Sequence, residues 1–219
     1  MTQTELSELL LIDKPAGMTS HDVVDEVRRA YKIRQVGHAG TLDPFATGLL
    51  IVAVGKMTKE LQKFVGLDKT YIATARLGAT SDTYDLKGQI IIKNAQLAVS
   101  EEEIRKVLMS FEGGYLQKAP AFSAKKVKGQ KLYEMARRGE DVEALRPSKQ
   151  VDIRNIKISS YQWPEVTFEV TCSSGTYIRS LAHDLGEKLG CGAYLTALRR
   201  TRIGSYKIED AKKLEELIP

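Results

Sequence analysis

The sequence predicts a mixed α/β (α+β) fold in which a mainly antiparallel sheet is flanked by helices. Two observations indicate the sheet: apolar runs with strand periodicity recur along the chain, and two of them, 151–160 and 166–172, are separated only by a break near Trp163-Pro164. A third observation is that segments with helical spacing and capping residues alternate with these strands. The chain has 219 residues, which fits one domain with a small insertion.

The N-terminal part of the chain begins with a strand, a helix and a glycine-rich loop. Residues 9–12 are all apolar and form a predicted buried strand. Ser20 is a predicted N-cap, because apolar residues follow it at helical spacing. Residues 37–48 hold three glycines and precede the apolar run 49–54, so we expect a loop that leads into a second buried strand.

The remaining elements follow from alternation and capping signals. Residues 70–77 alternate, so that Tyr71 and Ala73 share the face of a predicted strand. Ser100 and Glu103 have the spacing of a capping box, which predicts a helix. The other predicted elements are a short helix from Thr58, a strand at 88–92, a helix at 130–138, the strands 151–160 and 166–172, a helix at 177–189, a strand within 194–203 and a helix at 210–217.

The charge of the chain is concentrated in one segment. Lysine and arginine number 33 against 28 acidic residues, which gives a net charge of +5 and a mild preference for nucleic acid or anionic surfaces. Between Lys118 and Arg138 there are seven basic residues and one acid, Glu134. This segment is either a solvated loop and helix or an element that contacts phosphates.

Cysteine usage and hydropathy indicate a cytoplasmic protein. Cys172 and Cys191 form no C-x-x-C pair, and two cysteines in a chain of this length do not suggest a disulfide framework. No apolar run approaches the length of a membrane span. Residues 1–8 are polar and acidic, unlike a signal or transit peptide.

Several common sites are excluded by their spacing. The run Gly55-Lys56-Met57-Thr58 is not a P-loop, because Leu50 stands where a glycine is required. Neither a G-x-G-x-x-G nor a G-x-S-x-G pattern occurs. His21, His38 and His183 lack the spacing of a zinc site. We therefore predict no metal.

One loop combines features that suit catalysis. Gly37-His38-Ala39-Gly40-Thr41-Leu42-Asp43-Pro44-Phe45-Ala46-Thr47-Gly48 holds an Asp-Pro step beside a predicted core strand. Its glycines allow a ligand to approach the backbone closely, and Pro44 keeps Asp43 out of the helical region. The residues alone allow two interpretations: a structural Asp-Pro turn, or a rigidly held catalytic carboxylate.

This loop closely resembles the motif G-H-x-G-x-L-D-P-x-A-T-G-x-L of the bacterial TruB-type tRNA pseudouridine synthases, which surrounds the family's catalytic aspartate. Four further motifs resemble the family in the same order, and the resemblance runs from about Leu9 to the last predicted helix. These motifs are Asp13-Lys14-Pro15-Ala16-Gly17-Met18-Thr19-Ser20; Lys69-Thr70-Tyr71 with Arg76-Leu77-Gly78 and Thr80-Ser81-Asp82-Thr83; Pro120-Ala121-Phe122-Ser123-Ala124-Lys125-Lys126 with residues 132–139; and Cys172-Ser173-Ser174-Gly175-Thr176-Tyr177-Ile178-Arg179 with Leu198-Arg199-Arg200.

The resemblance implies a single pseudouridine synthase domain over residues 1–219 that isomerises a uridine to pseudouridine without a cofactor. The implied target is position 55 in the T-loop of tRNA, reached by flipping the base. The implied partner is the T-arm of tRNA, with no membrane, no obligate protein partner and a monomeric enzyme.

The same resemblance implies roles for individual residues. Asp43 is the implied catalytic carboxylate, which either attacks the sugar or assists proton removal at C2′. Arg179 is its implied charge partner, and Tyr71 stacks on the base and is a candidate for proton transfer at C5. The implied substrate-binding residues are His38, Lys14, Pro15, Tyr177 and Leu198. An RNA-clasping insertion at about 117–148 is implied to bind RNA through Lys125, Lys126, Lys128, Lys131, Arg137 and Arg138.

One departure and three alternatives accompany this interpretation. Family members commonly continue into a C-terminal PUA domain, whereas this sequence ends at Pro219, so we expect no PUA domain and fewer contacts to the acceptor end of tRNA. The first alternative is a guide-RNA-dependent synthase of the dyskerin type, which shares the G-H-x-G-T-L-D-P core. The others are a non-catalytic RNA-binding or tRNA-folding module and an unrelated α/β protein with a basic loop.

Overall fold

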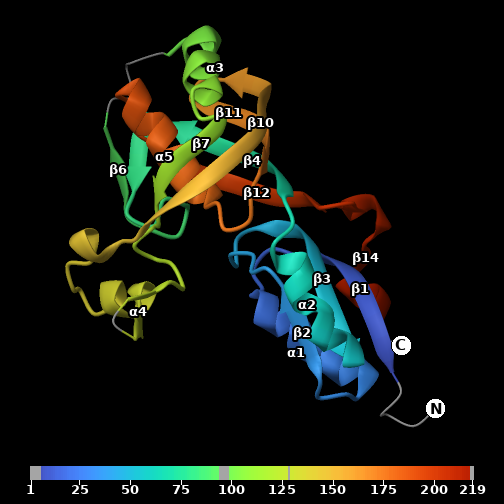
Figure 1. The fold of residues 1–219 in the computed structure, drawn as a ribbon. Helices are drawn as coiled ribbons and strands as arrows, with labels where there is room; N and C mark the ends of the chain where they lie inside the picture. The colour runs from blue at the N-terminus through green and yellow to red at the C-terminus, as the bar shows by residue number, and fades with distance from the viewer. Residues whose placement is uncertain (1–5, 94–98, 128, 218–219) are drawn as a thin grey trace. The chain divides into compact units, whose positions relative to one another are not determined.

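The structure is a computed structural model that describes residues 6–93, 99–127 and 129–217. The described residues form two compact units, one within residues 1–72 and 197–219 and the other within residues 73–196. Strands β4 (Lys69–Leu77) and β12 (Ala193–Ile203) pass from one unit into the other along the chain. Figure 1 labels the main elements of both units.

The first unit is built around two long antiparallel strands. Strand β1 (Ser7–Lys14) pairs with β3 (Thr47–Gly55) from Ser7 opposite Gly55 to Lys14 opposite Gly48. Strand β2 (Val36–Ala39) is also antiparallel to β3, and β12 joins β3 in parallel at Arg199 and Arg200. The short strands β13 (Tyr206–Lys207) and β14 (Lys212–Lys213) pair with β12 and β1.

Alternation along β1 and β3 gives this sheet two apolar faces. Leu10 and Leu50 belong to one core cluster with helix α1 (Ser20–Tyr31). Leu49 belongs to a second cluster. Helix α2 (Leu61–Val65), which follows the 3₁₀ turn η1 (Lys56–Glu60), packs against this second cluster. Because successive side chains of a strand point to opposite faces, one apolar run supplies both cores.

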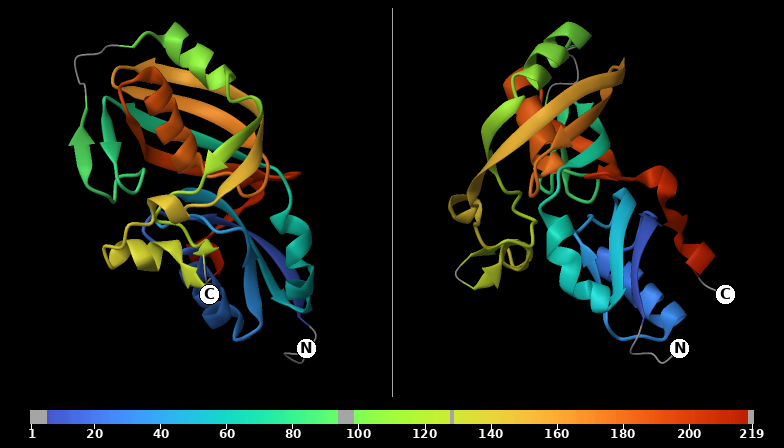
Figure 2. Two further views of the ribbon diagram at one scale, coloured as in Figure 1. Left: turned by 60° about the vertical axis from the view of Figure 1, so that its left-hand side comes forward. Right: turned by 45° about the vertical axis from the view of Figure 1, so that its right-hand side comes forward.

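The second unit contains further strands of the same sheet together with helices. Its strand order is β12, β4, β11 (Glu165–Cys172), β10 (Ser148–Gln162) and β7 (Gly113–Lys118). Strand β10 is antiparallel to both β11 and β7. Helices α3 (Glu101–Met109) and α5 (Ile178–Leu189) pack against each other, as Figure 2 shows in green and orange. The fold prediction is therefore confirmed: the sheet is mainly antiparallel and flanked by helices.

Smaller elements lie between these strands. Strands β5 (Ala79–Ser81) and β6 (Ile90–Ile92) form one two-stranded sheet, and β8 (Lys126–Val127) and β9 (Gln130–Lys131) form another. The rest are helix α4 (Leu132–Arg137) and the 3₁₀ turns η2 (Glu143–Leu145), η3 (Ile208–Asp210) and η4 (Leu214–Leu217). In the part of the chain that the structure describes, no helix has the length and apolar character needed to cross a membrane.

Three predicted elements differ from the structure. The predicted helix at 210–217 is wrong, because Lys212 and Lys213 pair with β1 as a parallel strand, and this pairing outweighs the helical propensity of the segment. The predicted loop 37–48 begins with strand β2. The N-cap of α1 is Thr19 instead of Ser20: the Thr19 hydroxyl accepts from the amide of Asp22, whose carboxylate accepts from the amide of Thr19.

Candidate active site

The Asp43 loop, residues 40–46, connects the paired strands β2 and β3 in the first unit. Leu42 and Ala46 are buried on either side of Asp43, which is itself half-buried. The amide of Ala46 donates to the carbonyl of Asp43 at 3.1 Å and closes a tight turn. The loop therefore holds the carboxylate between two buried anchors.

Two other segments fix the backbone of this loop. The Ser20 hydroxyl accepts from the amide of Leu42 at 2.9 Å and lies 3.3 Å from its carbonyl. The amide of Gly17 donates to the carbonyl of Pro44 at 2.8 Å. The residues immediately before and after Asp43 are thus bonded to the first residue of α1 and to the segment that joins β1 to α1, which restricts the position of the carboxylate.

Arg200 bonds to the first residue of the loop and to strand β3 beyond its end, a role that the sequence analysis did not assign. Its side chain is almost fully buried, with 1% exposed. Its Nε donates to the carbonyl of Leu49 at 2.8 Å and its Nη2 to the carbonyl of Gly40 at 3.1 Å. The sequence feature that could have indicated this role is the alternation along β12, which places Leu198 and Arg200 on the same buried face. An arginine that is buried in this way requires polar partners.

Lys14 lies at the end of β1 and is buried. Its Nζ donates to the carbonyls of Pro15 at 2.8 Å and Met18 at 2.7 Å. Burial lowers the pKa of Lys14 to about 8, although the negative charge of Asp43 opposes the shift. Lys14 and Asp43 are therefore electrostatically coupled, and Pro15 contributes its carbonyl while its ring is exposed.

His38 lies on β2, and its Nδ1 is buried without a hydrogen-bond partner among the described residues. Burial lowers the pKa of His38, and the positive charge of Arg200 lowers it further. The imidazole is therefore mostly neutral at pH 7. An unsatisfied ring nitrogen of this kind can hydrogen-bond a ligand.

Tyr71 and Leu198 also belong to the first unit. Tyr71 is 8% exposed on β4, and Leu198 is 7% exposed on β12. The neighbouring strand segments are linked where the Thr201 hydroxyl donates to the carbonyl of Thr70. Of the predicted site residues, the first unit thus contains Asp43, Tyr71, His38, Lys14, Pro15 and Leu198.

Arg179 and Tyr177 belong to the second unit. Arg179 is 5% exposed in the first turn of α5 and donates to the carbonyls of Thr83 at 2.9 Å and Phe122 at 3.1 Å. Its Nη1 is also 3.5 Å from the buried carboxylate of Asp85, a residue that the sequence analysis did not select. The sequence feature that could have indicated Asp85 is its position two residues after the motif Thr80-Ser81-Asp82-Thr83.

Tyr177 precedes α5 and is held through its backbone. Its amide donates to the side-chain oxygen of Gln117 at 2.8 Å, and the side-chain nitrogen of Gln117 donates back to its carbonyl at 3.0 Å. Gln117 is itself buried on β7. The start of α5 is therefore fixed to the end of β7, next to the basic segment.

The basic residues predicted to bind RNA lie in the segment of chain that connects strand β7 to strand β10. Lys125 and Lys126 are exposed, as are Arg137 and Arg138. Lys131 and Arg137 both lie over the ring of Tyr133, at 5.4 and 5.3 Å from its centroid. Lys131 faces Glu134, and Arg138 pairs with Glu140, so part of this charge is neutralised locally. Lys128 lies outside the described residues.

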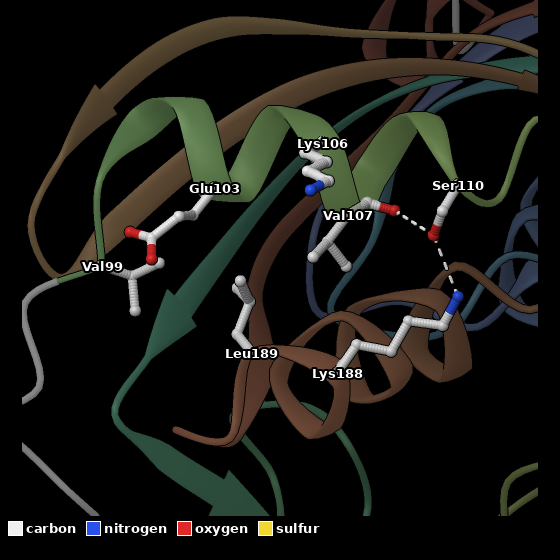
Figure 3. Close-up of a pocket in the computed structure, with 7 residues that line it drawn as sticks. All are labelled: Val99, Glu103, Lys106, Val107, Ser110, Lys188 and Leu189. Atoms are coloured by element: carbon white, nitrogen blue, oxygen red, sulfur yellow. Dashed lines mark hydrogen bonds between the residues drawn. The ribbon is translucent and has the colours of Figure 1, made fainter.

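A groove elsewhere in the second unit contains none of these residues. It has a volume of about 490 Å³ and lies between α3 and α5, lined by Val107, Leu189 and two lysines, Lys106 and Lys188 (Figure 3). The Nζ of Lys188 donates to the hydroxyl of Ser110. The described residues also contain no group of three or more His, Cys, Asp or Glu side chains with the arrangement of a metal site.

Comparison with known proteins identifies the family. The sequence matches the description "TruB family pseudouridylate synthase (N terminal domain)" over residues 28–178 and "tRNA pseudouridylate synthase B C-terminal domain" over residues 179–219. The tRNA pseudouridine synthase B of Syntrophobacter fumaroxidans is 44% identical over 217 residues, covering 99% of this chain and 70% of that protein. Its counterpart in Geobacter sulfurreducens is 46% identical over 208 residues, covering 95% of this chain and 68% of that protein.

Solved structures agree with these matches. A chain of the archaeal box H/ACA sRNP Nop10-Cbf5 complex is 30% identical with a TM-score of 0.71, over 96% of this chain and 52% of that chain. A chain of a Cbf5-Nop10-Gar1 complex is 32% identical with a TM-score of 0.74, over 94% of this chain and 52% of that chain. The present chain thus spans about half the length of both.

These matches and the fold define a pseudouridine synthase, an isomerase that modifies RNA. Within that class, the chain belongs to the TruB family of tRNA pseudouridine synthases. The resemblance seen in the sequence motifs is therefore confirmed at the level of the family.

Proposed function

We propose that this chain converts the uridine at position 55, in the T-loop of tRNA, to pseudouridine without a guide RNA or a protein partner. The observation that carries the proposal is the Asp43 loop, whose backbone is bonded on both sides of the aspartate and, through Arg200, at Gly40 and at the neighbouring strand β3. A carboxylate held in this way is preorganised for chemistry on a bound nucleotide. Asp43 either attacks the sugar or assists proton removal at C2′.

The other site residues have supporting roles in this proposal. Arg179 is the charge partner of Asp43 in this proposal, and Tyr71 stacks on the extruded uracil and takes part in proton transfer at C5. His38, which is mostly neutral, supports base flipping through its buried nitrogen. Lys14, Pro15, Tyr177 and Leu198 are substrate-binding residues in this proposal. The reaction exchanges one glycosidic bond for another without a change in oxidation state, so the proposal includes no cofactor.

RNA binding is proposed to depend on the basic segment between β7 and β10. Lys125, Lys126, Lys131, Arg137 and Arg138 contact phosphates of the T-arm in this proposal, together with Lys128. The enzyme acts as a monomer.

Incubation with an unmodified T-arm hairpin tests the proposal. The wild-type chain alone is expected to form pseudouridine, detected by mass spectrometry of the digested RNA. Asp43→Asn is expected to reduce the rate by at least about 10³-fold, because the variant lacks the carboxylate, while hairpin affinity stays within about threefold. Asp210→Asn, which changes an exposed aspartate of the same unit, is the matched control and should retain full activity.

Each other outcome selects an alternative. Normal turnover by Asp43→Asn would reject Asp43 as the catalytic residue. A wild-type chain that is inactive alone but active with an added guide RNA and its proteins would favour a guide-dependent enzyme; the similarity to Cbf5 chains is the observation behind this second candidate. Tight binding without turnover under either condition would favour a tRNA-folding module.

A further inference from the structure

Three side chains are stacked at the base of segment 119–147, which connects β7 to β10. The rings of Tyr84 and His183 are parallel, with centroids 3.9 Å apart and 9° between their planes. The guanidinium of Arg146 lies over the Tyr84 ring, 5.4 Å from its centroid. The three residues come from distant parts of the second unit: the loop after β5, helix α5 and the end of the segment itself.

Arg146 also closes the neck of the segment, which is the place where its first residue, Ala119, and its last residue, Pro147, are hydrogen-bonded to each other. Lys118 and Ser148 are paired across β7 and β10, and the amide of Ala119 donates to the carbonyl of Pro147 at 3.0 Å. The Nε of Arg146 donates to the carbonyl of Ala119 at 2.7 Å, so the last turn of the segment is bonded to its first residue. Its Nη1 pairs with Glu143 at 2.7 Å, and only 6% of the side chain is exposed.

Tyr84 has an unusual backbone conformation. Its φ is 63°, in the left-handed region, where a bulky residue is rare and strained. Such a conformation persists when the surroundings impose it. Here the amide of Tyr84 donates to the carbonyl of Ser81 and its carbonyl accepts from the amide of Leu195, while the ring is almost completely buried. The loop is therefore fixed so that the ring contacts both Arg146 and His183.

Helix α5 contacts the neck at several further points. The Ser180 hydroxyl donates to the carbonyl of Lys118 at 2.9 Å, and Arg179 donates to the carbonyl of Phe122. His183 lies one helical turn beyond Arg179. The contacts of Arg179 to Thr83 and Asp85 do not involve the Tyr84 ring, so the stack can be altered without deleting them.

We propose that Arg146, Tyr84 and His183 form a stacked hinge that fixes the direction of segment 119–147 relative to α5, and that they are positioning residues for RNA capture. This inference rests on the proposed function, in which the segment carries the phosphate-contacting lysines and arginines. Contacts of a guanidinium and an imidazole with the same ring resist rotation at the neck. The segment is then already partly ordered before RNA binds, so that RNA binding has a smaller entropic cost.

Substitution of Tyr84 tests the hinge. Tyr84→Leu removes the ring, and hydrogen exchange of the full chain without RNA is expected to become at least about fivefold faster at the amides of Ala119, Leu132 and Tyr133, whose hydrogen bonds order the segment. The Kd for a T-arm hairpin should rise about tenfold, while the rate of isomerisation of bound RNA stays within about threefold. Tyr84→Phe keeps the ring and should restore exchange and affinity to within about twofold of wild type.

A matched control and a second variant keep the test specific. Tyr206→Leu removes one ring of the aromatic pair with Phe64 in the first unit and should leave exchange in the segment unchanged. If Tyr84→Leu does not fold, Arg146→Lys, which keeps the charge and loses the planar stack, should give the same pattern.

The two proposals fail in different ways. Unchanged exchange in a folded Tyr84→Leu or Arg146→Lys protein would overturn the hinge. Faster exchange with unchanged RNA affinity would keep the hinge as a structural feature, but would overturn its role in RNA capture and the assignment of the segment as an RNA contact. A loss of isomerisation rate with unchanged affinity would also overturn it, because the hinge acts on binding.

Discussion

At the scale of single residues, Arg200 and Lys14 show how buried cations organise the Asp43 loop. Both are buried, and both use backbone carbonyls as acceptors. A buried charge without partners is strongly unfavourable, so each side chain requires its acceptor carbonyls in one arrangement. The acceptors of Arg200 include Gly40 of the loop, and those of Lys14 lie in the segment after β1, which is bonded to the loop through Gly17. That arrangement also fixes the loop segment that carries Asp43.

Replacing Arg200 with methionine tests its effect on stability, catalysis and the pKa of His38, with the neighbouring Arg199 as the control. Arg200→Met leaves the carbonyls of Gly40 and Leu49 without this donor, which should lower the free energy of unfolding by about 3 kcal/mol. The loosened loop should lower kcat about 10- to 100-fold with KM within about twofold. The pKa of His38 should rise, because a positive charge beside it is lost, and NMR titration of the imidazole measures this.

Arg199→Met is the control for this substitution. Arg199 pairs with the partly exposed carboxylate of Asp13 at 2.7 Å, so its loss should cost about 1 kcal/mol or less. It should leave the pKa of His38 unchanged. Wild-type kcat together with an unchanged His38 pKa in Arg200→Met would reject this role of Arg200.

Lys14 should give the protein a distinctive dependence on pH. Its pKa is about 8 when folded and 10.5 ordinarily, so between these values the unfolded chain holds a proton that the folded chain has lost. Stability contributed by this site is therefore lowest below pH 8 and rises up to pH 10.5. Relative to Lys14→Met, the wild-type free energy of unfolding should increase by about 3 kcal/mol over this window.

Urea denaturation at a series of pH values measures this difference. Lys207→Met, which alters an exposed lysine, supplies the control. Wild-type and Lys14→Met curves that remain parallel from pH 8 to 10.5 would show that Lys14 does not lose its proton more easily in the folded state.

At the scale of elements, the sequence predicted those whose signals are local. Apolar runs and alternation predicted β1, β3 and β4, and a capping box predicted α3, in which Ser100 accepts from the amide of Glu103. Strand β2 was missed because three of its four residues, Gly37, His38 and Ala39, do not favour a strand, and only pairing with β3 makes them one. The helix expected at 210–217 was wrong for the same kind of reason, since β1 supplies a partner for Lys212 and Lys213.

The candidate site shows the same division. Asp43, Tyr71 and Arg179 were selected because they stand in recognisable motifs. Arg200 and Asp85 were not selected, because their importance depends on partners distant in sequence: Gly40 for Arg200, and Arg179 for Asp85. A local pattern of residues does not predict which buried charged side chain will bond to which distant acceptor.

Gly48 illustrates how close packing between strands constrains the site. It lies opposite Arg200 where β3 and β12 run in parallel, and its φ is 105°. A Cβ at this position would lie 2.3 Å from the carbonyl oxygen of Arg200. Gly48→Ala should therefore destabilise the protein by about 3 kcal/mol or more, through backbone strain and displacement of β12.

Thermal and urea unfolding measure this effect, and Gly66→Ala is the control. Gly66 ends α2 with a φ of −75°. Apart from the adjacent backbone, no atom of the described residues lies within 4 Å of the place that an added Cβ would occupy, so alanine should change stability by less than about 0.5 kcal/mol. Equal stability of the Gly48→Ala and Gly66→Ala proteins would contradict the close approach of β3 and β12.

At the scale of the whole molecule, net charge and its placement make different predictions for RNA binding. The net charge is +5, and any two lysine-to-alanine substitutions reduce it to +3. If RNA responded only to total charge, every such pair would weaken binding equally. If phosphates contact the segment between β7 and β10, the position of the lysines decides the effect.

Lys125 and Lys126 provide the sharpest test of placement. Both are exposed, and within the described ranges neither forms an ion pair with an acid, unlike Lys131 and Arg138. Lys125→Ala/Lys126→Ala should weaken hairpin binding and reduce the slope of log Kd against log salt by about 1.5, because two phosphate contacts are lost. Lys212→Ala/Lys213→Ala changes net charge equally and should leave the slope unchanged. Titrations from low to moderate salt measure both; equal slopes for the two variants would show that total charge governs binding.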